Sequence, residues 1–158
     1  MDKNMLKESV KKVELIHSED IPDLDLYMDQ ILTLINKNEQ LITKTMINNY
    51  SKAKVITPVK GKKYSKEQVL QIIMINELKN NLSIKAIKEV INKIAIEDTE
   101  KIYNEVIEMN EEDQENEERL INSLLELDSE EKKLTSLLRL NHLANLVKSY
   151  MEMIRELD

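Results

Sequence analysis

The chain has 158 residues and a mass of 18.5 kDa, with 41% hydrophobic and 34% charged residues. This length predicts one ordinary domain, or a small domain with an appendage, whose core needs no disulfide bonds. The absence of cysteine excludes thiol nucleophiles, iron–sulfur clusters and thiolate zinc sites. A single glycine excludes phosphate-binding glycine loops and dense strand–turn alternation, so we expect an almost purely helical fold.

Charge is strongly segregated along a chain whose formal net charge is −7. Residues 1–42 carry 5 lysines and 9 acidic residues, a balance of −4. Residues 43–95 carry 11 lysines and 3 acidic residues (+8), and residues 96–158 carry 7 basic and 18 acidic residues (−11). The basic block favours a unit that binds a polyanion, followed by an acidic appendage. The alternative is two solvated surfaces that differ in sign.

The first predicted elements lie before the basic block. Residues 1–20 form a polar segment with a weak apolar stripe, which predicts a short helix. Pro22 is typical of a first helical turn, with Asp23 or Asp25 as its cap, so a helix is predicted from there. We expect this helix to end at residues 36–38, an Asn-Lys-Asn sequence. Its apolar face is the set Leu24, Met28, Ile31, Leu32 and Ile35.

The next predicted helix begins with Thr43 or Thr45 as its cap and ends near Lys54. Its expected inner face consists of Met46, Ile47 and Tyr50. Residues 55–58 are predicted to be extended, because a proline disfavours helix in the residue before it. The only glycine, Gly61, lies among Lys60, Lys62 and Lys63, which predicts a tight turn in a small hairpin or wing.

Two further helices are predicted from serine caps. Ser65 with Gln68 three residues later is a capping-box pattern, and the helix that follows is expected to end at Asn80–Asn81. Its predicted inner face is Val69, Ile72, Ile73, Ile75 and Leu78. Ser83 is predicted to cap the second helix, whose inner face is the set Ala86, Ile87, Val90, Ile91 and Ile94.

The remainder of the chain is predicted to form two helices. Residues 99–127 are acidic, and residues 111–118 are so polar that they indicate either a solvated helix or a hinge. The last helix begins at Asp128–Ser129 and carries apolar residues at heptad spacing, which predicts a helix–helix interface. The predicted dimer-interface residues are Leu137, Leu140, Ala144, Val147, Met151 and Ile154.

Three segments resemble the mercuric-resistance-regulator (MerR) superfamily. They are residues 47–58, with Tyr50 and Pro58; residues 64–69, Tyr-Ser-Lys-Glu-Gln-Val; and residues 82–91, Leu-Ser-Ile-Lys-Ala-Ile-Lys-Glu-Val-Ile. The resemblance implies a winged helix-turn-helix over residues 21–96, a long helix that pairs two subunits, and DNA binding in transcription regulation. Residues 97–158 are then an acidic two-helix region. No effector domain is expected, because almost nothing follows the last helix.

A second resemblance covers most of the chain. Residues 21–30 and residues 41–54 are similar to the uncharacterised bacterial family called domain of unknown function eighteen-thirty-six. This family supplies relatives but implies no activity.

The chain departs from the MerR pattern at the positions that contact DNA. The glycine of the superfamily's turn is Lys54, which must adopt the turn with a side chain or reshape it. Asparagine pairs with adenine edges and lysine neutralises phosphates, so the expected partner remains double-stranded DNA. The predicted contacts are Lys44, Thr45, Asn48, Asn49, Lys52, Lys60, Lys62 and Lys63. The alternative for the asparagines is plain solvent exposure, and for the lysines a solvated turn.

No enzyme, metal or cofactor is predicted. The acidic pairs lie in the most solvated segment, and neither His17 nor His142 has a second ligand at metal-binding spacing. No apolar span or signal-peptide layout is present, which predicts a cytoplasmic protein without a membrane partner. We expect a DNA-binding transcriptional regulator that acts as a homodimer. The alternatives are a protein–protein adaptor whose helix-turn-helix does not bind DNA, and an architectural DNA-bending factor.

Overall fold

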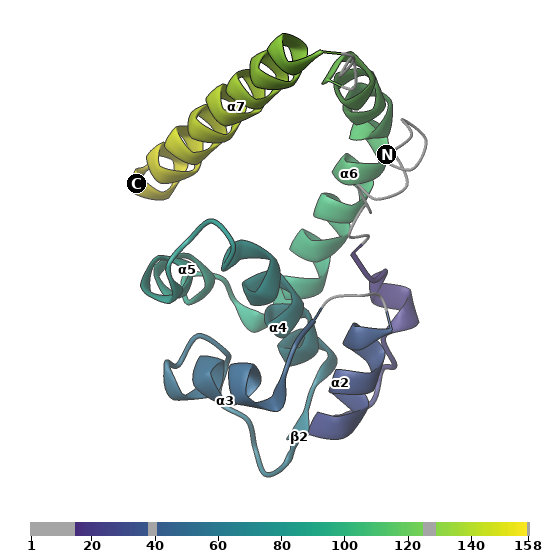
Figure 1. Cartoon of the computed structure of the whole chain (residues 1–158). Coiled ribbons are helices and arrows are strands. Elements are labelled where there is room, and N and C mark those ends of the chain that lie inside the picture. Colours follow the sequence, from purple (N-terminus) through teal and green to yellow (C-terminus); the bar gives the residue numbers. More distant parts are fainter. Residues whose placement is uncertain (1–14, 38–40, 125–128, 158) are drawn as a thin grey trace. The chain divides into compact units, whose positions relative to one another are not determined.

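The structure is a computed structural model that describes residues 15–37, 41–124 and 129–157. The predicted helix of the polar N-terminal segment therefore lies mostly outside the described residues. Those that are described fall into two compact units, which divide between Met109 and Asn110 (Figure 1). We call residues 15–109 the N-terminal unit and residues 110–157 the C-terminal unit.

The N-terminal unit is mostly helical, with one two-stranded antiparallel sheet. Its elements, in chain order, are the 3-10 helix η1 (Ser18–Asp20), β1 (Leu26–Tyr27), α2 (Met28–Asn36), α3 (Lys44–Lys52), β2 (Lys63–Tyr64), α4 (Lys66–Leu78), α5 (Ile84–Ile91), the 3-10 helix η2 (Ile96–Asp98) and the first part of α6 (Thr99–Leu124).

The start of the first α-helix differs from the prediction. The predicted cap at Asp23 or Asp25 is wrong, because α2 begins at Met28. The preceding residues are extended instead, and Leu26 pairs with Tyr64 across the sheet. The N–H of Tyr27 donates to Oε1 of Gln30 over 2.8 Å and closes the first turn of α2. The helix ends at Asn36, within the predicted range.

Helix α4 is the centre of the N-terminal unit, and side chains from all round it are buried. Ser65 caps it as predicted: its N–H donates to Oε1 of Gln68 over 2.8 Å, and its hydroxyl accepts from the Gln68 N–H. Burying an isoleucine or leucine side chain stabilises a fold by about 1.5–3 kcal/mol. The fully enclosed apolar residues of α4 are Val69, Leu70, Ile72, Ile73 and Ile75.

Helix α5 packs on α4 through part of its predicted inner face. Ser83 accepts the N–H of Ala86 as its cap, and Ile87 and Ile91 are buried. The prediction that Val90 and Ile94 lie inside is wrong, because they are 41% and 40% exposed. Ile87 and Ile91 fill the contact with α4, which leaves Val90 on the flank of the helix and Ile94 beyond its end.

The first part of α6 belongs to the N-terminal unit, which therefore extends beyond residue 96. Tyr103 and Ile107 are buried in its core. The hydroxyl of Tyr103 donates to the backbone oxygen of Ile16 over 2.7 Å. Lys66 links α4 to α6 by an ion pair: its Nζ lies 2.8 Å from Oε1 of Glu100. The same Nζ also lies 2.7 Å from Oδ1 of Asp23. Hydrogen bonds to Asp23 and then Glu100 raise the pKa of Lys66.

The C-terminal unit consists of the rest of α6 and of α7 (Glu130–Glu156), which begins where predicted and is capped by Ser129, whose hydroxyl accepts the N–H of Lys132. Residues 111–118 are helical, as in the first of the two predicted alternatives. A cavity of about 460 Å³ separates the two helices, between Leu120 of α6 and a flank of α7 that includes Leu138 and His142. None of the six predicted interface residues lines it.

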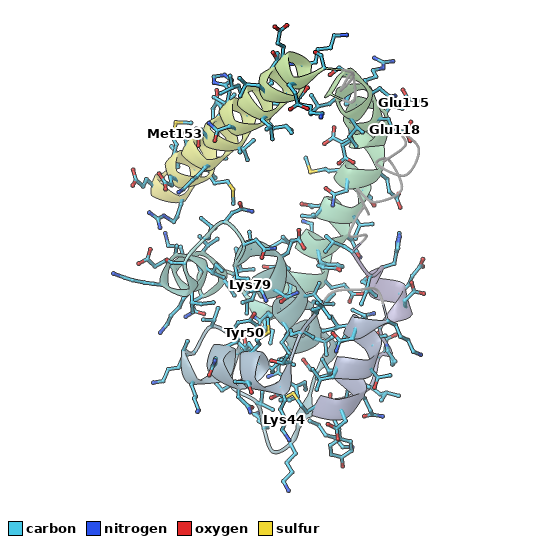
Figure 2. All side chains as sticks on the ribbon, viewed as in Figure 1. Lys44, Tyr50, Lys79, Glu115, Glu118 and Met153 are labelled. Atoms are coloured by element: carbon cyan, nitrogen blue, oxygen red, sulfur yellow. The ribbon has the colours of Figure 1, made fainter. Side chains whose placement is uncertain are left out.

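Most of the apolar seam of α7 is exposed in the single chain, and only Met151 is partly buried. Leu137 and Ile154 are each 63% exposed, and Val147 is 56% exposed. The neighbouring stripe is open as well, and Met153 lies half-exposed on it (Figure 2). Within the described residues, none of the helices has the length and apolar character needed to cross a membrane.

Candidate nucleic-acid interface

Helix α3 carries five of the eight predicted contacts. Its cap is Thr43, whose hydroxyl accepts the N–H of Met46 over 3.2 Å. Ile47 and Tyr50 are buried, so the helix rests on the core by the face that the sequence predicts. The exposed remainder of the helix includes Lys44, Thr45, Asn48, Asn49 and Lys52.

Two lysines of the basic block support the fold rather than the exposed face. Lys79, the residue that follows α4, contacts α3: burial lowers its pKa, and its ammonium is 3.9 Å from Sδ of Met46 (Figure 2). Lys66 is held by its two carboxylate partners. The net charge of residues 43–95 therefore overstates the positive charge on the exposed face of α3, because these two lysines do not contribute to that face.

Helix α3 ends in a left-handed turn at Lys54, whose φ is +57°. The N–H of Lys54 donates to the Ser51 oxygen over 3.0 Å, and the N–H of Val55 donates to the Tyr50 oxygen over 3.1 Å. This bond pair is the Schellman motif that usually carries glycine at the left-handed position. Lys54 thus adopts the turn with its side chain, the first of the two predicted alternatives.

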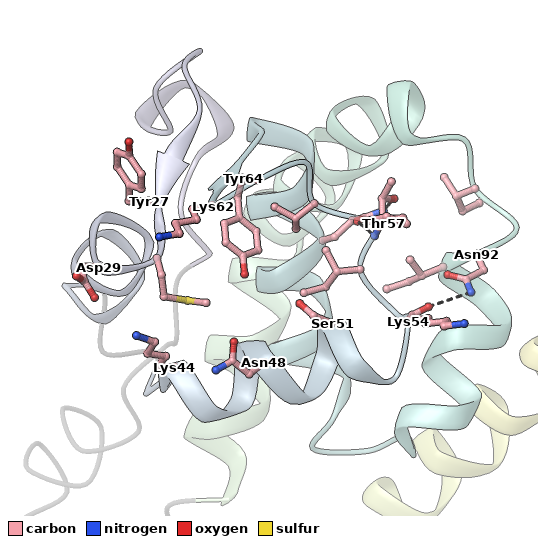
Figure 3. A pocket seen from close by; sticks show the side chains of 18 residues that line it. Tyr27, Asp29, Lys44, Asn48, Ser51, Lys54, Thr57, Lys62, Tyr64 and Asn92 are labelled. Carbon is pink, nitrogen blue, oxygen red and sulfur yellow. Dashed lines mark hydrogen bonds between the residues drawn. The ribbon is translucent and has the colours of Figure 1, made fainter.

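Asn92, at the end of α5, holds this turn from outside. Its Nδ2 donates to the backbone oxygen of Lys54 over 3.3 Å, a bond that Figure 3 shows as a dashed line. The exit of α3 is therefore tied to a helix that lies far along the sequence.

Two glutamines of α4 fix the chain after this turn. Gln71 accepts the N–H of Thr57 over 2.9 Å and donates to its hydroxyl over 3.1 Å. Gln68 donates to the backbone oxygens of Thr57 (3.0 Å) and Pro58 (3.1 Å). Both glutamines are buried, and they satisfy backbone groups that no regular structure pairs. The sequence predicted Gln68 only as a cap, and it gave no signal for Gln71.

The glycine turn leads into β2 rather than closing a hairpin. Gly61 has a φ of +78°, which favours glycine. The strand after it pairs with β1, so the predicted hairpin is wrong and the turn is the tip of a loop. The reason is that β2 pairs with β1, which precedes α2, whereas the turn pattern around Gly61 depends only on neighbouring residues. Lys63 lies with its ammonium 5.0 Å from the centre of the Tyr27 ring, a cation–π distance.

A concave face joins α2, α3, this loop and the end of α5 around a cavity of about 1100 Å³ (Figure 3). Of the eight predicted contacts, Lys44, Asn48 and Lys62 line it. Lys54 lines it as well and was not predicted, while Asp29 supplies an acidic group. The other predicted residues are exposed but lie outside the cavity: Thr45, Asn49, Lys52, Lys60 and Lys63.

Basic and amide side chains predominate among the polar groups around the cavity. The lysines Lys44, Lys54 and Lys62 and the amides of Asn48, Gln71 and Asn92 lie around an open hollow. No group of three or more potential metal ligands occurs in the described part of the chain. These features define a mostly helical protein with a lysine-lined concave face on one compact unit.

The chain belongs to the family described as Domain of unknown function (DUF1836), which matches residues 16–112. The match covers the described N-terminal unit almost completely and confirms the predicted family. Comparisons with curated proteins and with solved structures find no match.

Proposed function

We propose that this protein binds double-stranded DNA through the concave face and acts as a transcriptional regulator in the cytoplasm. The observation that carries the proposal is the convergence of Lys44, Lys54 and Lys62 on one cavity, with Asn48 among them. Lysines placed around a helix neutralise phosphates, and asparagine pairs with the N6 and N7 edge of adenine. The proposal assigns the protein no enzymatic activity, metal or cofactor.

In this proposal the N-terminal unit is a winged helix-turn-helix of the MerR type. Helices α2 and α3 are the helix-turn-helix pair, α3 enters the major groove, and the loop around Gly61 is the wing. The order of elements and the fixed loop support this assignment. Asn48 lines the cavity and Asn49 does not, so Asn48 is the residue proposed to read a base.

The regulator is proposed to act as a homodimer through α7. The support is a seam of six residues at heptad spacing on a helix of 27 residues, exposed at every position except the partly buried Met151. A helix with so apolar a face is stable in water only against a partner. A two-fold dimer presents two copies of α3, so its DNA sites would be palindromes.

A second function is favoured by the same exposed seam. A protein–protein adaptor would use the apolar face of α7 and the acidic surface of α6 to dock a basic partner, without binding DNA. Substitutions in the concave face would then leave the binding of that protein partner unchanged. DNA binding separates the two proposals directly.

The test is selection of genomic DNA fragments by the purified full chain at two salt concentrations. Specific enrichment that weakens as salt rises supports a regulator, because phosphate contacts release counterions. The variants Lys44→Gln and Lys62→Gln are each expected to flatten the slope of log affinity against log salt by about 0.9. Lys85→Gln is the matched control, since Lys85 is exposed on α5 and does not line the cavity.

Three results would contradict the proposal. Retention of no DNA at low salt would favour the adaptor. Equal slopes for Lys44→Gln and Lys85→Gln would place the DNA on another surface. Binding with no sequence preference would indicate an architectural role instead.

A further inference from the structure

The left-handed turn at Lys54 is the strained point of the N-terminal unit. Among the described residues other than glycine, Lys54 alone has a positive φ. A side chain in this conformation brings Cβ too close to the carbonyl oxygen, a cost that glycine avoids. Glycine or asparagine is the usual residue at this position of a Schellman motif. A residue held against its own preference indicates that the side chain serves a purpose which outweighs the strain.

That purpose lies outside the fold. The ammonium of Lys54 makes no hydrogen bond or ion pair within the described residues, and the side chain is exposed. The bonds that shape the turn use only its backbone: the N–H to Ser51, and the oxygen that accepts from Asn92. A glycine could make all of them. Packing therefore does not explain the lysine.

The position of Lys54 supplies the explanation. It lines the same cavity as Lys44 and Lys62, at the opposite end of α3 from Lys44 (Figure 3). Asn92 and the Schellman bonds fix its Cα, so less chain entropy is lost when the side chain binds than from a free loop. The cation is thus presented on a turn with a fixed backbone.

We propose that Lys54 contacts a phosphate of the bound duplex, and that the strained turn is retained because it places this cation beyond the end of α3. Asn92 acts as a positioning residue by holding the carbonyl of the turn. This inference rests on the proposed function, since the phosphate belongs to the DNA of that proposal. It adds a contact that the sequence pattern does not indicate.

The test uses three variants of the full chain, each measured for melting temperature and for the salt dependence of binding to a selected DNA fragment. Lys54→Gly removes strain and cation together. We expect its melting temperature to rise by roughly 3 °C and its affinity near 0.1 M salt to fall by roughly 5- to 10-fold, with a slope flatter by about 0.9. Stability and binding should move in opposite directions.

The other two variants separate the two effects. Lys54→Gln keeps the strained backbone and removes the charge, so it should lose affinity like Lys54→Gly without the gain in melting temperature. Lys54→Arg keeps the charge and should retain the slope of the wild type. Lys85→Gln again controls for the general loss of one surface charge.

Each outcome bears on a different statement. If the wild type binds DNA and Lys54→Gly binds with an unchanged slope, the phosphate contact is wrong while the proposed function stands. If Lys54→Gly melts no higher than Lys54→Gln, the turn stores no strain and the argument for retention fails. If the wild type binds no DNA, the proposed function fails and this inference fails with it.

Discussion

The two units use apolar residues in opposite ways. In the N-terminal unit, α4 is buried on all sides, and isoleucines from α2, α3, α5 and α6 close around it. In the C-terminal unit, α7 carries apolar residues along its whole length and exposes most of them. Ser136 is its one buried residue in the described part of the helix. Periodicity therefore locates an apolar face, but only the surrounding structure decides whether one chain covers it.

The units also differ in how their charges are used. In the N-terminal unit, Lys66 and Lys79 are bonded to other parts of the fold, whereas Lys44, Lys54 and Lys62 line a shared hollow. The acidic residues of α6 beyond Met109 lie on exposed helix. The first unit has a concave face of defined chemistry, and the second has an apolar seam and a diffuse acidic surface. Four substitutions test this contrast.

The largest effect is expected in the core of the N-terminal unit. Ile72→Ala leaves a cavity beside α4 and should lower the free energy of unfolding by about 3–4 kcal/mol. Leu134→Ala is the comparison in α7, where the side chain is exposed and lies off the heptad seam, so its cost should stay within about 0.5 kcal/mol. Urea unfolding followed by circular dichroism measures both. Equal costs would mean that α7 is covered as fully as α4.

Gln71→Ala is expected to have the next largest effect. It leaves the N–H and hydroxyl of Thr57 without partners, at a cost of about 2 kcal/mol, and should weaken DNA binding because the loop is no longer fixed. Gln30→Ala is the control, since Gln30 accepts one exposed backbone bond and its loss should cost about 0.5–1 kcal/mol. Urea unfolding and DNA affinity are the measurements. An unchanged affinity for Gln71→Ala would show that the loop does not depend on this bond.

Tyr103→Phe removes one buried hydrogen bond and should cost about 1 kcal/mol at neutral pH. Burial, followed by the charge of Glu77, raises the pKa of Tyr103 well above its usual 10. A raised pKa favours the folded state below pH 10, and this contribution is lost as pH rises above 10, where the unfolded phenol ionises. The variant should therefore lose stability less steeply between pH 9 and 11. Parallel curves for the two proteins would contradict a buried neutral phenol.

Val147→Glu should have the smallest effect on the N-terminal unit, within about 0.5 kcal/mol, because the substitution lies in the other unit. Its effect should appear in sedimentation equilibrium, where the proposed dimer dissociates because a charge enters the apolar seam. Asn145→Glu adds the same charge on the polar side of α7 and should leave the dimer intact. A wild type that sediments as a monomer would refute the dimer without touching DNA binding.

Local signals predicted the helix boundaries well. Thr43, Ser65, Ser83 and Ser129 all cap helices, because each hydroxyl accepts an N–H three residues away and needs no other part of the fold. The turn at Lys54 was also predicted, from the resemblance that places the turn glycine of the MerR superfamily at this position. These features depend on a few consecutive residues.

Features that depend on distant residues were missed or misread. The start of α2 was predicted too early because Leu26 is held by Tyr64, which lies beyond two helices. No sequence pattern indicates the bonds of Gln71 to Thr57 and of Asn92 to Lys54. A single amide side chain does not belong to a periodic pattern that would point to its distant partner. The concave face was therefore predicted as a set of exposed lysines, and its shape came from contacts that composition does not encode.

The pairing of β1 with β2 has a consequence for how the N-terminal unit opens. Its register joins Leu26 to Tyr64 and Tyr27 to Lys63, so α2, α3 and the glycine loop lie within one closed segment of chain. Contiguous segments often exchange their amide hydrogens as cooperative units, or foldons, and we expect this segment to be one. If the two strands separate, the pairing that closes the segment containing α3 and the loop is lost, while α4 retains its contacts with α5. Native-state hydrogen exchange should then report a common opening free energy for the Tyr64 amide and the amides of α3, below that of α4.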